Sequence, residues 1–276
     1  MTARIHAEPR SKGLLTPQRT DPAFAPPVTI ARRAAVGRAS FFVRHYWLPR
    51  WELPPSGSIR QEVLEYPTAN LVIEPQAAAL YRAQRGAGSR TLEGSGWAFG
   101  VLLNPGVARG WAGVSVRSLP SATPLDRLVA PGTPQLTLTV RNRMSRGDDE
   151  GAIEAFESWL DGLPEPDEDA QLVARIVSEA ESDRTLLRVE ELADRFGLGV
   201  RHLQRLVAGH IGFGPKWLIQ RYRLQEAAAA LRSEHPPSLA TLAAELGYAD
   251  QAHFSREFRA VIGATPGVYA AAQGRP

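Results

Sequence analysis

The chain has 276 residues, of which 43% are hydrophobic and 22% are charged, and its formal net charge is +3. That length suits two domains or one large domain, and the ordinary composition excludes a wholly disordered chain and a fibrous repeat. The absence of cysteine excludes disulfides, thiolate nucleophiles and Cys-rich zinc sites. Only His6 and His45, of the six histidines, precede residue 200, so a His-based metal site is not expected there.

Hydropathy bears on the expected cellular location of the protein, and the charge distribution bears on its division into structural units. No window holds the roughly 20 consecutive apolar residues that a membrane helix needs, and the start, MTARIHAEPRSKGLL, lacks the apolar core of a signal peptide. We therefore expect a cytoplasmic protein, associated with the nucleoid if it binds DNA.

The charge is unevenly distributed along the chain. Residues 1–146 carry 19 Lys and Arg against 8 Asp and Glu, residues 147–183 carry 1 against 13, and residues 184–276 carry 12 against 8. An acidic segment between two basic ones indicates separate units.

The sequence texture divides the chain further. Residues 1–27 are rich in Pro, Arg, Ala and Thr without periodicity, which predicts a disordered tail. Residues 28–145 alternate short apolar runs, such as 135–140, with Gly and Pro turns, which is typical of a β-rich barrel or sandwich. Residues 146–183 have helical periodicity and predict an acidic connector, followed by a helical domain over 184–273. The predicted fold class is α+β.

The carboxyl-terminal part contains two copies of one pattern, over 189–218 and 239–269. Seven positions match if the second copy is one residue longer inside its turn. The matching positions are Leu192 with Leu242, Gly197 with Gly247, Leu203 with Phe254, Arg205 with Arg256, Val207 with Phe258, Gly212 with Gly263, and Pro215 with Pro266. This agreement indicates an internal duplication.

Each copy predicts two helices around a tight turn. The first helix ends at Gly197 or Gly247, where a positive φ is commonly needed, and Asp250 is placed to cap the second helix of the second copy. The residues that face outward on the second helices are Arg201, Gln204 and Arg205 in one copy and Gln251, Ala252, Ser255, Arg256 and Arg259 in the other. This is the pattern of a helix-turn-helix, whose second helix reads the major groove. One copy is equally consistent with a plain helical hairpin, whereas two copies favour DNA binding.

The segment between the copies, 215–232, has no internal Pro or Gly and predicts one long helix. Such a helix spans about 27 Å, and successive major grooves on one face of DNA lie about 34 Å apart. The helix is therefore suited to hold two reading helices apart. Lys216, Arg221 and Arg223 are candidates for phosphate contacts, with Arg259 from the second copy, although a solvated helix face is an alternative for the first three.

The carboxyl-terminal domain resembles that of AraC/XylS-type transcription regulators in three segments, LADRFGLGVRHLQRLV, GPKWLIQRYRLQEA and LAAELGYADQAHFSREFRAVIGATPGVY. The resemblance covers about residues 186–272 and implies seven helices, with the third and the sixth in the grooves. By position, it implies base contacts from Arg201, Gln204 and Arg205 on the third helix and from Gln251, Ala252, Ser255 and Arg256 on the sixth. Gly199 departs from the family pattern, which usually has a Ser or Thr cap there, so a less rigid helix start is expected.

The amino-terminal domain resembles an uncharacterised cupin-like domain found ahead of such modules, through WELPPSGSIRQEVLEYPTANLVIEP and LEGSGWAFGVLLNPGVARGW. The resemblance implies effector binding, dimerisation, or both. Four tryptophans are candidates to line an apolar effector pocket, with core packing as the commoner role. They are Trp47, Trp51, Trp97 and Trp111. With one histidine in the domain and no nucleophile elbow or phosphate loop, we expect no metal, no cofactor and no catalytic residue.

Three functions remain to be compared. The first is a one-component, sequence-specific transcription regulator that responds to a small-molecule effector. The second is a constitutive DNA-binding regulator whose amino-terminal domain only dimerises. The third, a DNA-repair enzyme on the same module, loses its main route because family members that accept alkyl groups use a cysteine, which this chain lacks. Candidate partners are double-stranded DNA, a small-molecule effector, RNA polymerase and a second copy of the chain; a membrane partner is not expected.

Overall fold

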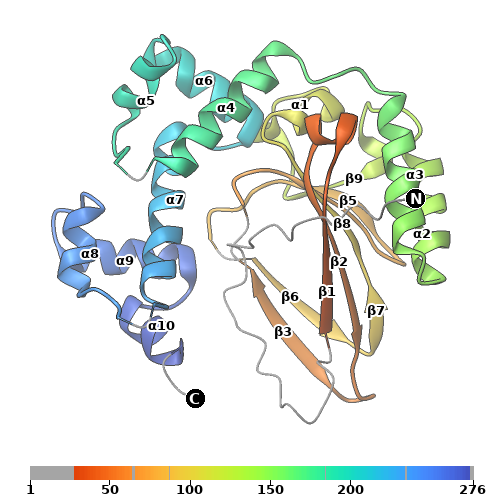
Figure 1. The fold of residues 1–276 in the computed structure, drawn as a ribbon, viewed down its shortest axis with the longest axis horizontal. Helices are drawn as coiled ribbons and strands as arrows, with labels where there is room; N and C mark the ends of the chain where they lie inside the picture. Colours follow the sequence, from red (N-terminus) through yellow and green to blue (C-terminus); the bar gives the residue numbers. More distant parts are fainter. Residues whose placement is uncertain (1–27, 64–65, 87, 184, 234, 274–276) are drawn as a thin grey trace.

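The structure, a computed structural model, describes residues 28–63, 66–86, 88–183, 185–233 and 235–273. The predicted disordered tail lies outside the described residues. A sheet-rich amino-terminal domain is followed by a helical carboxyl-terminal region (Figure 1). The predicted α+β class, with the β-rich domain first, is confirmed. Among the described residues, no helix has the length and hydropathy needed to cross a membrane.

The amino-terminal domain is built on an antiparallel sheet with the strand order β1-β2-β8-β4-β5-β9, and β7 pairs with β2. The strands are β1 (Val28–Ala34), β2 (Val43–Glu52), β4 (Asn70–Ile73), β5 (Ala78–Tyr81), β7 (Ser95–Trp97), β8 (Phe99–Leu103) and β9 (Ala122–Pro124). A separate two-stranded sheet pairs β3 (Ser58–Val63) with β6 (Gly88–Glu93). Strand β8 lies between two neighbours and is buried along its whole length, which accounts for its unbroken apolar sequence, FGVLL.

Two helices, α2 (Thr133–Ser145) and α3 (Asp149–Asp161), pack against one face of this sheet (Figure 1). Tyr46 of β2 contacts Phe156 of α3 with ring centroids 6.0 Å apart. The prediction of a strand over 135–140 is wrong, because this segment belongs to α2. The buried residues of α2 include Leu136, Val140 and Met144, every fourth position, and a six-residue window is too short to show that helical period.

The predicted acidic connector, 146–183, is also corrected by the structure, because its two helices belong to different cores. Phe156 of α3 is fully buried with the residues of the sheet. Val173 and Ile176 of α4 (Glu168–Ser182) are fully buried with the residues of the helical region. The acidic side chains lie at exposed and half-buried positions of both helices, so the change in charge along the sequence does not coincide with a domain boundary here.

The helical region contains seven described helices, of which α4 precedes residues 186–272, the part of the chain that carries the resemblance. After α4 these are α5 (Val189–Arg195), α6 (Val200–Ile211), α7 (Pro215–Ala230), α8 (Leu239–Glu245), α9 (Gln251–Ile262) and α10 (Pro266–Gln273). One core joins α4, α5, α6 and the first half of α7, and a second core joins the rest of α7 with α8, α9 and α10. The two copies of the predicted tandem repeat thus form two small cores, and α7 contributes residues to both.

His45 of β2 gives the amino-terminal domain a pH-dependent stability. The residue is 8% exposed, and burial, with the nearby charges of Arg32 and Arg44, lowers the pKa of His45 to about 4. In the unfolded chain, His45 takes up a proton near pH 6.5, whereas in the folded chain it stays neutral down to a lower pH. The contribution of His45 to the free energy of unfolding is therefore fully present above pH 6.5 and is lost as the pH falls toward 4.

We therefore expect the free energy of unfolding to fall by about 2 kcal/mol between pH 7 and pH 5 through this residue. Urea unfolding of the wild type and of His45→Asn at both pH values measures the effect. The variant should lose less stability than the wild type over this interval. An equal loss in both proteins would show that His45 is not the group responsible.

Candidate nucleic-acid interface

The first unit presents the outer face of α6. Gly197 has φ +63, which ends α5 in the left-handed conformation expected from the sequence. Gly199 is the N-cap of α6 and makes no side-chain cap hydrogen bond, as expected for glycine. Leu203 and Val207 are fully buried below the helix. The three predicted base-reading residues, Arg201, Gln204 and Arg205, are all exposed.

The second unit repeats this geometry with a stronger cap. The Asp250 carboxylate accepts a hydrogen bond of 2.6 Å from the backbone N–H of His253, which fixes the start of α9. Phe254 and Phe258 are fully buried and hold the helix on its core. The predicted contact residues Gln251, Ala252, Arg256 and Arg259 are exposed, and Ser255 is half-buried.

Helix α7 joins the two units through both cores. Its 16 residues correspond to about 24 Å of helix. Leu218 and Tyr222 pack in the first core, and Leu224 and Ala227 pack in the second. Because the middle of this helix contributes to both cores, the two reading helices are fixed relative to one another.

Arg221 and Arg223 are not available to phosphates, which corrects the prediction for both. They are 1% and 2% exposed. Arg221 donates from Nη1 to the backbone oxygen of Arg85, at 3.1 Å. Arg223 donates from Nη2 to the backbone oxygens of Ala180 and Asp183, at 2.9 and 2.6 Å. The sequence signal for this burial is the lack of a continuous polar face on α7. Lys216, at the exposed start of the helix, remains suited to a phosphate.

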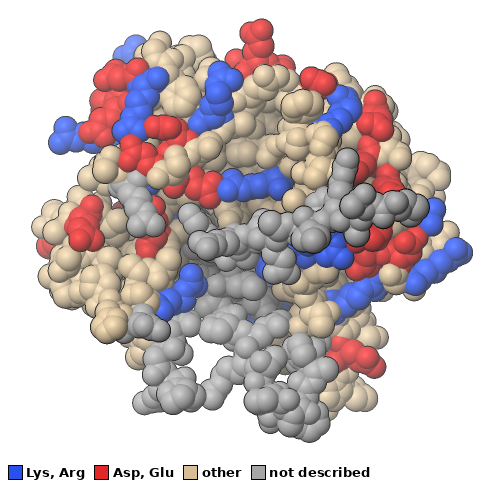
Figure 2. Space-filling view, in the orientation of Figure 1, with Lys and Arg blue, Asp and Glu red and all other residues tan. Residues whose placement is uncertain are grey.

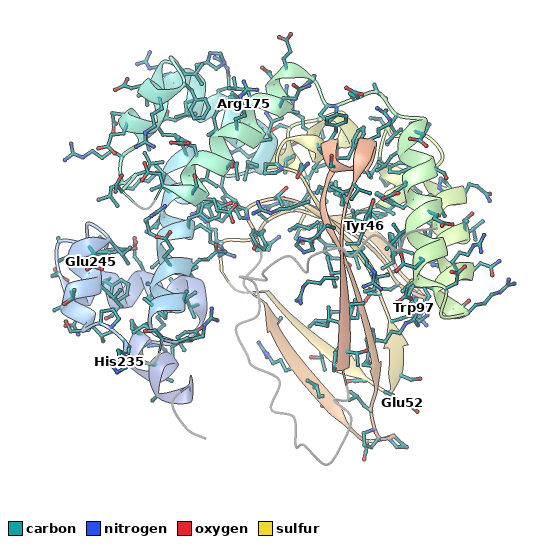
Figure 3. The ribbon with its side chains drawn as sticks, in the orientation of Figure 1. Tyr46, Glu52, Trp97, Arg175, His235 and Glu245 are labelled. Atoms are coloured by element: carbon teal, nitrogen blue, oxygen red, sulfur yellow. The ribbon has the colours of Figure 1, made fainter. Side chains whose placement is uncertain are left out.

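The four tryptophans do not line one cavity in the described part of the chain. Trp111 is buried in the core, 5.0 Å from Trp159 between ring centroids. Trp97 packs on the side of the sheet that faces α2, beside Arg50 (Figure 3). Trp51 packs on the opposite side, with Leu53 and Leu92 among its neighbours. Trp47 lies across Gly100, where a Cβ would come within 2.0 Å of the indole ring. The described residues therefore do not bring the four tryptophans together in one pocket.

The amino-terminal domain contacts α6 without covering its reading face. Ser115, just before η2 (Val116–Ser118), donates to the backbone oxygen of Gly209 at 3.4 Å. Arg109 of α1 (Val107–Ala112) lies 3.5 Å from the ring of His210. These contacts involve the carboxyl-terminal half of α6, whereas the predicted base-reading residues lie in its amino-terminal half. Arg201, Gln204 and Arg205 remain exposed beside this interface.

Ion pairs neutralise much of the surface away from the reading helices. Figure 2 shows acidic and basic side chains interspersed over the helices on the viewed face. Arg195, on α5, forms ion pairs with Glu179 and Asp183, and Arg44 of β2 pairs with Glu181 of α4 at 2.6 Å. In contrast, Arg201, Arg205 and Arg256 form no ion pair with any carboxylate in the described residues, so their charges remain available to an anionic partner.

Sequence reasoning missed a basic cleft beside α6. The cleft has a volume of about 460 Å³ and combines Arg82, Arg85 and Arg117 of the amino-terminal domain with Gln204 and Lys216. The arginines come from segments that are far from α6 in the sequence, so no local motif could have indicated their meeting. The described residues contain no group of three or more His, Asp or Glu side chains arranged to hold a metal ion.

A family described as a helix-turn-helix domain matches residues 192–272. HTH-type transcriptional activator RhaS of Pectobacterium carotovorum is 39% identical over 75 residues, which are 27% of this chain and 26% of that protein. A putative AraC-like transcription regulator of Streptomyces lividans is 32% identical over 121 residues, 44% of this chain and 38% of that protein. The carboxyl-terminal region is an AraC-type helix-turn-helix domain. The matched residues include both α6 and α9, and the aligned part of the chain spans about a quarter of the length of the RhaS protein.

The amino-terminal domain has a match of its own. Residues 39–123 match a family described as a domain of unknown function, which overlaps the sheet that precedes the AraC-type domain. ToxT from Vibrio cholerae O395 is a solved structure with a TM-score of 0.39 and 11% identity, over 90% of this chain and 98% of that chain. A likeness at this level transfers no property to the present chain.

Proposed function

We propose that the chain is a sequence-specific transcription regulator that reads two neighbouring major-groove sites with α6 and α9. The observation that carries this proposal is the pair of exposed Arg and Gln faces, Arg201 to Arg205 and Gln251 to Arg256, on helices that α7 joins. Arginine donates two hydrogen bonds to guanine and glutamine pairs with adenine, so both faces carry side chains suited to base recognition. The proposal assigns the chain no catalytic step and places it at the nucleoid.

The amino-terminal domain is proposed to control this binding in response to a small-molecule effector. Its support is the direct contact of α1 and η2 with α6, and of the Arg85 backbone with α7. A change in the amino-terminal domain would therefore reach one reading helix and the helix that joins the two. A second copy of the chain and RNA polymerase are the partners that regulation of transcription would involve.

Selection of bound duplexes from a random-sequence pool tests the DNA-reading proposal. The wild type should enrich one motif with two conserved blocks, one for each reading helix, whose centres are about one helical turn of 10 base pairs apart. A pool that keeps its starting base frequencies after repeated rounds would contradict sequence-specific binding.

A further inference from the structure

The cleft beside α6 lies where the amino-terminal domain meets the first helix-turn-helix unit. Its walls are Arg82, Arg85 and Arg117 on one side and the turn between α6 and α7 on the other. Lys216, on the second wall, adds a fourth cationic side chain. The cleft has no acidic residue in its lining, so its positive charge is not compensated locally.

Some arginines of the domain outside the cleft are paired with carboxylates, whereas three cationic side chains of the cleft are not paired within the described residues. Arg33 pairs with Glu150 at 2.8 Å, and Arg143 pairs with Asp148 at 2.8 Å. Arg85, Arg117 and Lys216 are exposed and form no ion pair with a carboxylate anywhere in the described ranges. Like charges that gather without a counter-charge favour an anionic partner.

Aromatic contacts hold two of the arginines in place. The guanidinium groups of Arg82 and Arg85 lie 5.8 and 5.2 Å from the ring centre of Phe213, and Phe213 stacks on Trp217 with centroids 4.2 Å apart. Arg82 also donates from Nε to the backbone oxygen of Leu119 at 2.9 Å. Cation–π contacts and this hydrogen bond restrict the arginines, which lowers the entropy cost of binding an anion.

The cleft is continuous with the proposed DNA face. Gln204, a proposed base-reading residue of α6, lines it together with Lys216, which lies in the first turn of α7. A duplex whose bases meet Gln204 would therefore bring its backbone past the mouth of this cleft. Phosphate oxygens accept planar, bidentate hydrogen bonds from arginine.

We propose that the amino-terminal domain binds DNA directly, with Arg85 and Arg117 contacting backbone phosphates beside the site that α6 reads. This inference rests on the proposed function, because it requires α6 to lie in a major groove. It adds a role to the domain of unknown function, which extends the DNA contact beyond the two helix-turn-helix units. Because its contacts are to phosphates, the domain reads no base itself.

The variant Arg85→Gln/Arg117→Gln tests this proposal by the salt dependence of DNA affinity. Arg127→Gln/Arg146→Gln removes the same charge from exposed positions of the domain outside the cleft and is the matched control. On a selected duplex that extends one turn beyond the α6 site, the negative slope of log K against log salt should become less steep by about 2 for the cleft variant, since each lost phosphate contact removes about 0.9 from its magnitude. The control should keep the wild-type slope.

A duplex trimmed to the bases under α6 and α9 completes the test. On this shorter DNA, the cleft variant and the wild type should give the same slope. Equal slopes for the cleft variant and the control on the extended duplex would overturn the proposal while leaving DNA reading intact. A wild type that binds no duplex would instead refute the proposed function. Stabilisation of the wild type, but not of the cleft variant, by inorganic phosphate in a thermal shift, with unchanged DNA slopes, would assign the cleft to a small anion and also overturn the proposal.

Discussion

Arg223→Ala is expected to lower the free energy of unfolding of the helical region by about 3–5 kcal/mol, as found when one partner of a buried charged network is removed. The Arg223 guanidinium donates to the backbone oxygens of Ala180 and Asp183 at the end of α4 and pairs with Glu226 at 2.7 Å. The last carbonyls of a helix have no partner within the helix, so this side chain satisfies acceptors that α4 itself leaves unpaired.

Lys216→Ala is the matched control for this prediction, because Lys216 is a cationic residue on the same helix but is exposed. Its effect on unfolding should stay within about 0.5 kcal/mol, as for most surface substitutions. Urea denaturation followed by far-ultraviolet circular dichroism measures both. If Arg223→Ala unfolds at the same urea concentration as Lys216→Ala and instead weakens DNA binding, Arg223 acts at the surface and its structural role is refuted.

Arg256→Ala is expected to weaken binding to the selected duplex by about 1–3 kcal/mol, or about 5- to 150-fold, and to relax the base preference at one position. Arg256 is exposed in the first half of α9, whose start is fixed by the Asp250 cap. Arg205 has the matching place on α6, so Arg205→Ala should relax the preference at a base in the other block. Competition binding against duplexes that carry each single base change measures both effects.

Arg259→Ala is the control for base reading, because Arg259 lies in the last turn of the same helix and is also exposed. We expect it to weaken binding to selected and random duplexes by the same factor. The negative slope of log K against log salt should become less steep by about 1. Equal losses on selected and random DNA for Arg256→Ala would place Arg256 on the phosphate backbone and remove it from the base-reading set.

Local sequence patterns predicted the AraC-type domain well because its structure is set by near neighbours. The positive φ at Gly197 and Gly247, the cap at Asp250 and the buried Phe254 all lie within one supersecondary unit. The turn and core of such a unit follow from residues a few positions apart.

The errors arise where long-range packing decides the environment of a residue. Arg221 is buried by a loop of the amino-terminal domain more than 130 positions away in the sequence, and Arg223 by the end of α4, which is 43 positions from it at Ala180. The arginines of the cleft likewise lie beside α6 because of long-range packing across the domain interface, and local sequence periodicity cannot predict such contacts. Charge composition likewise misplaced the boundary between α3 and α4, since solvated faces carry charge in both domains.

Guanine-methylation interference over the selected duplex tests the central claim most directly, because it reports which bases are approached through the major groove. The account predicts two clusters of interfering guanines on one face of the DNA, about 10 base pairs apart, the separation of successive major grooves. The Arg205→Ala variant should lose interference in one cluster only, and Arg256→Ala in the other only. A single cluster, or the loss of both clusters with either variant, would contradict a structure in which α6 and α9 read separate grooves.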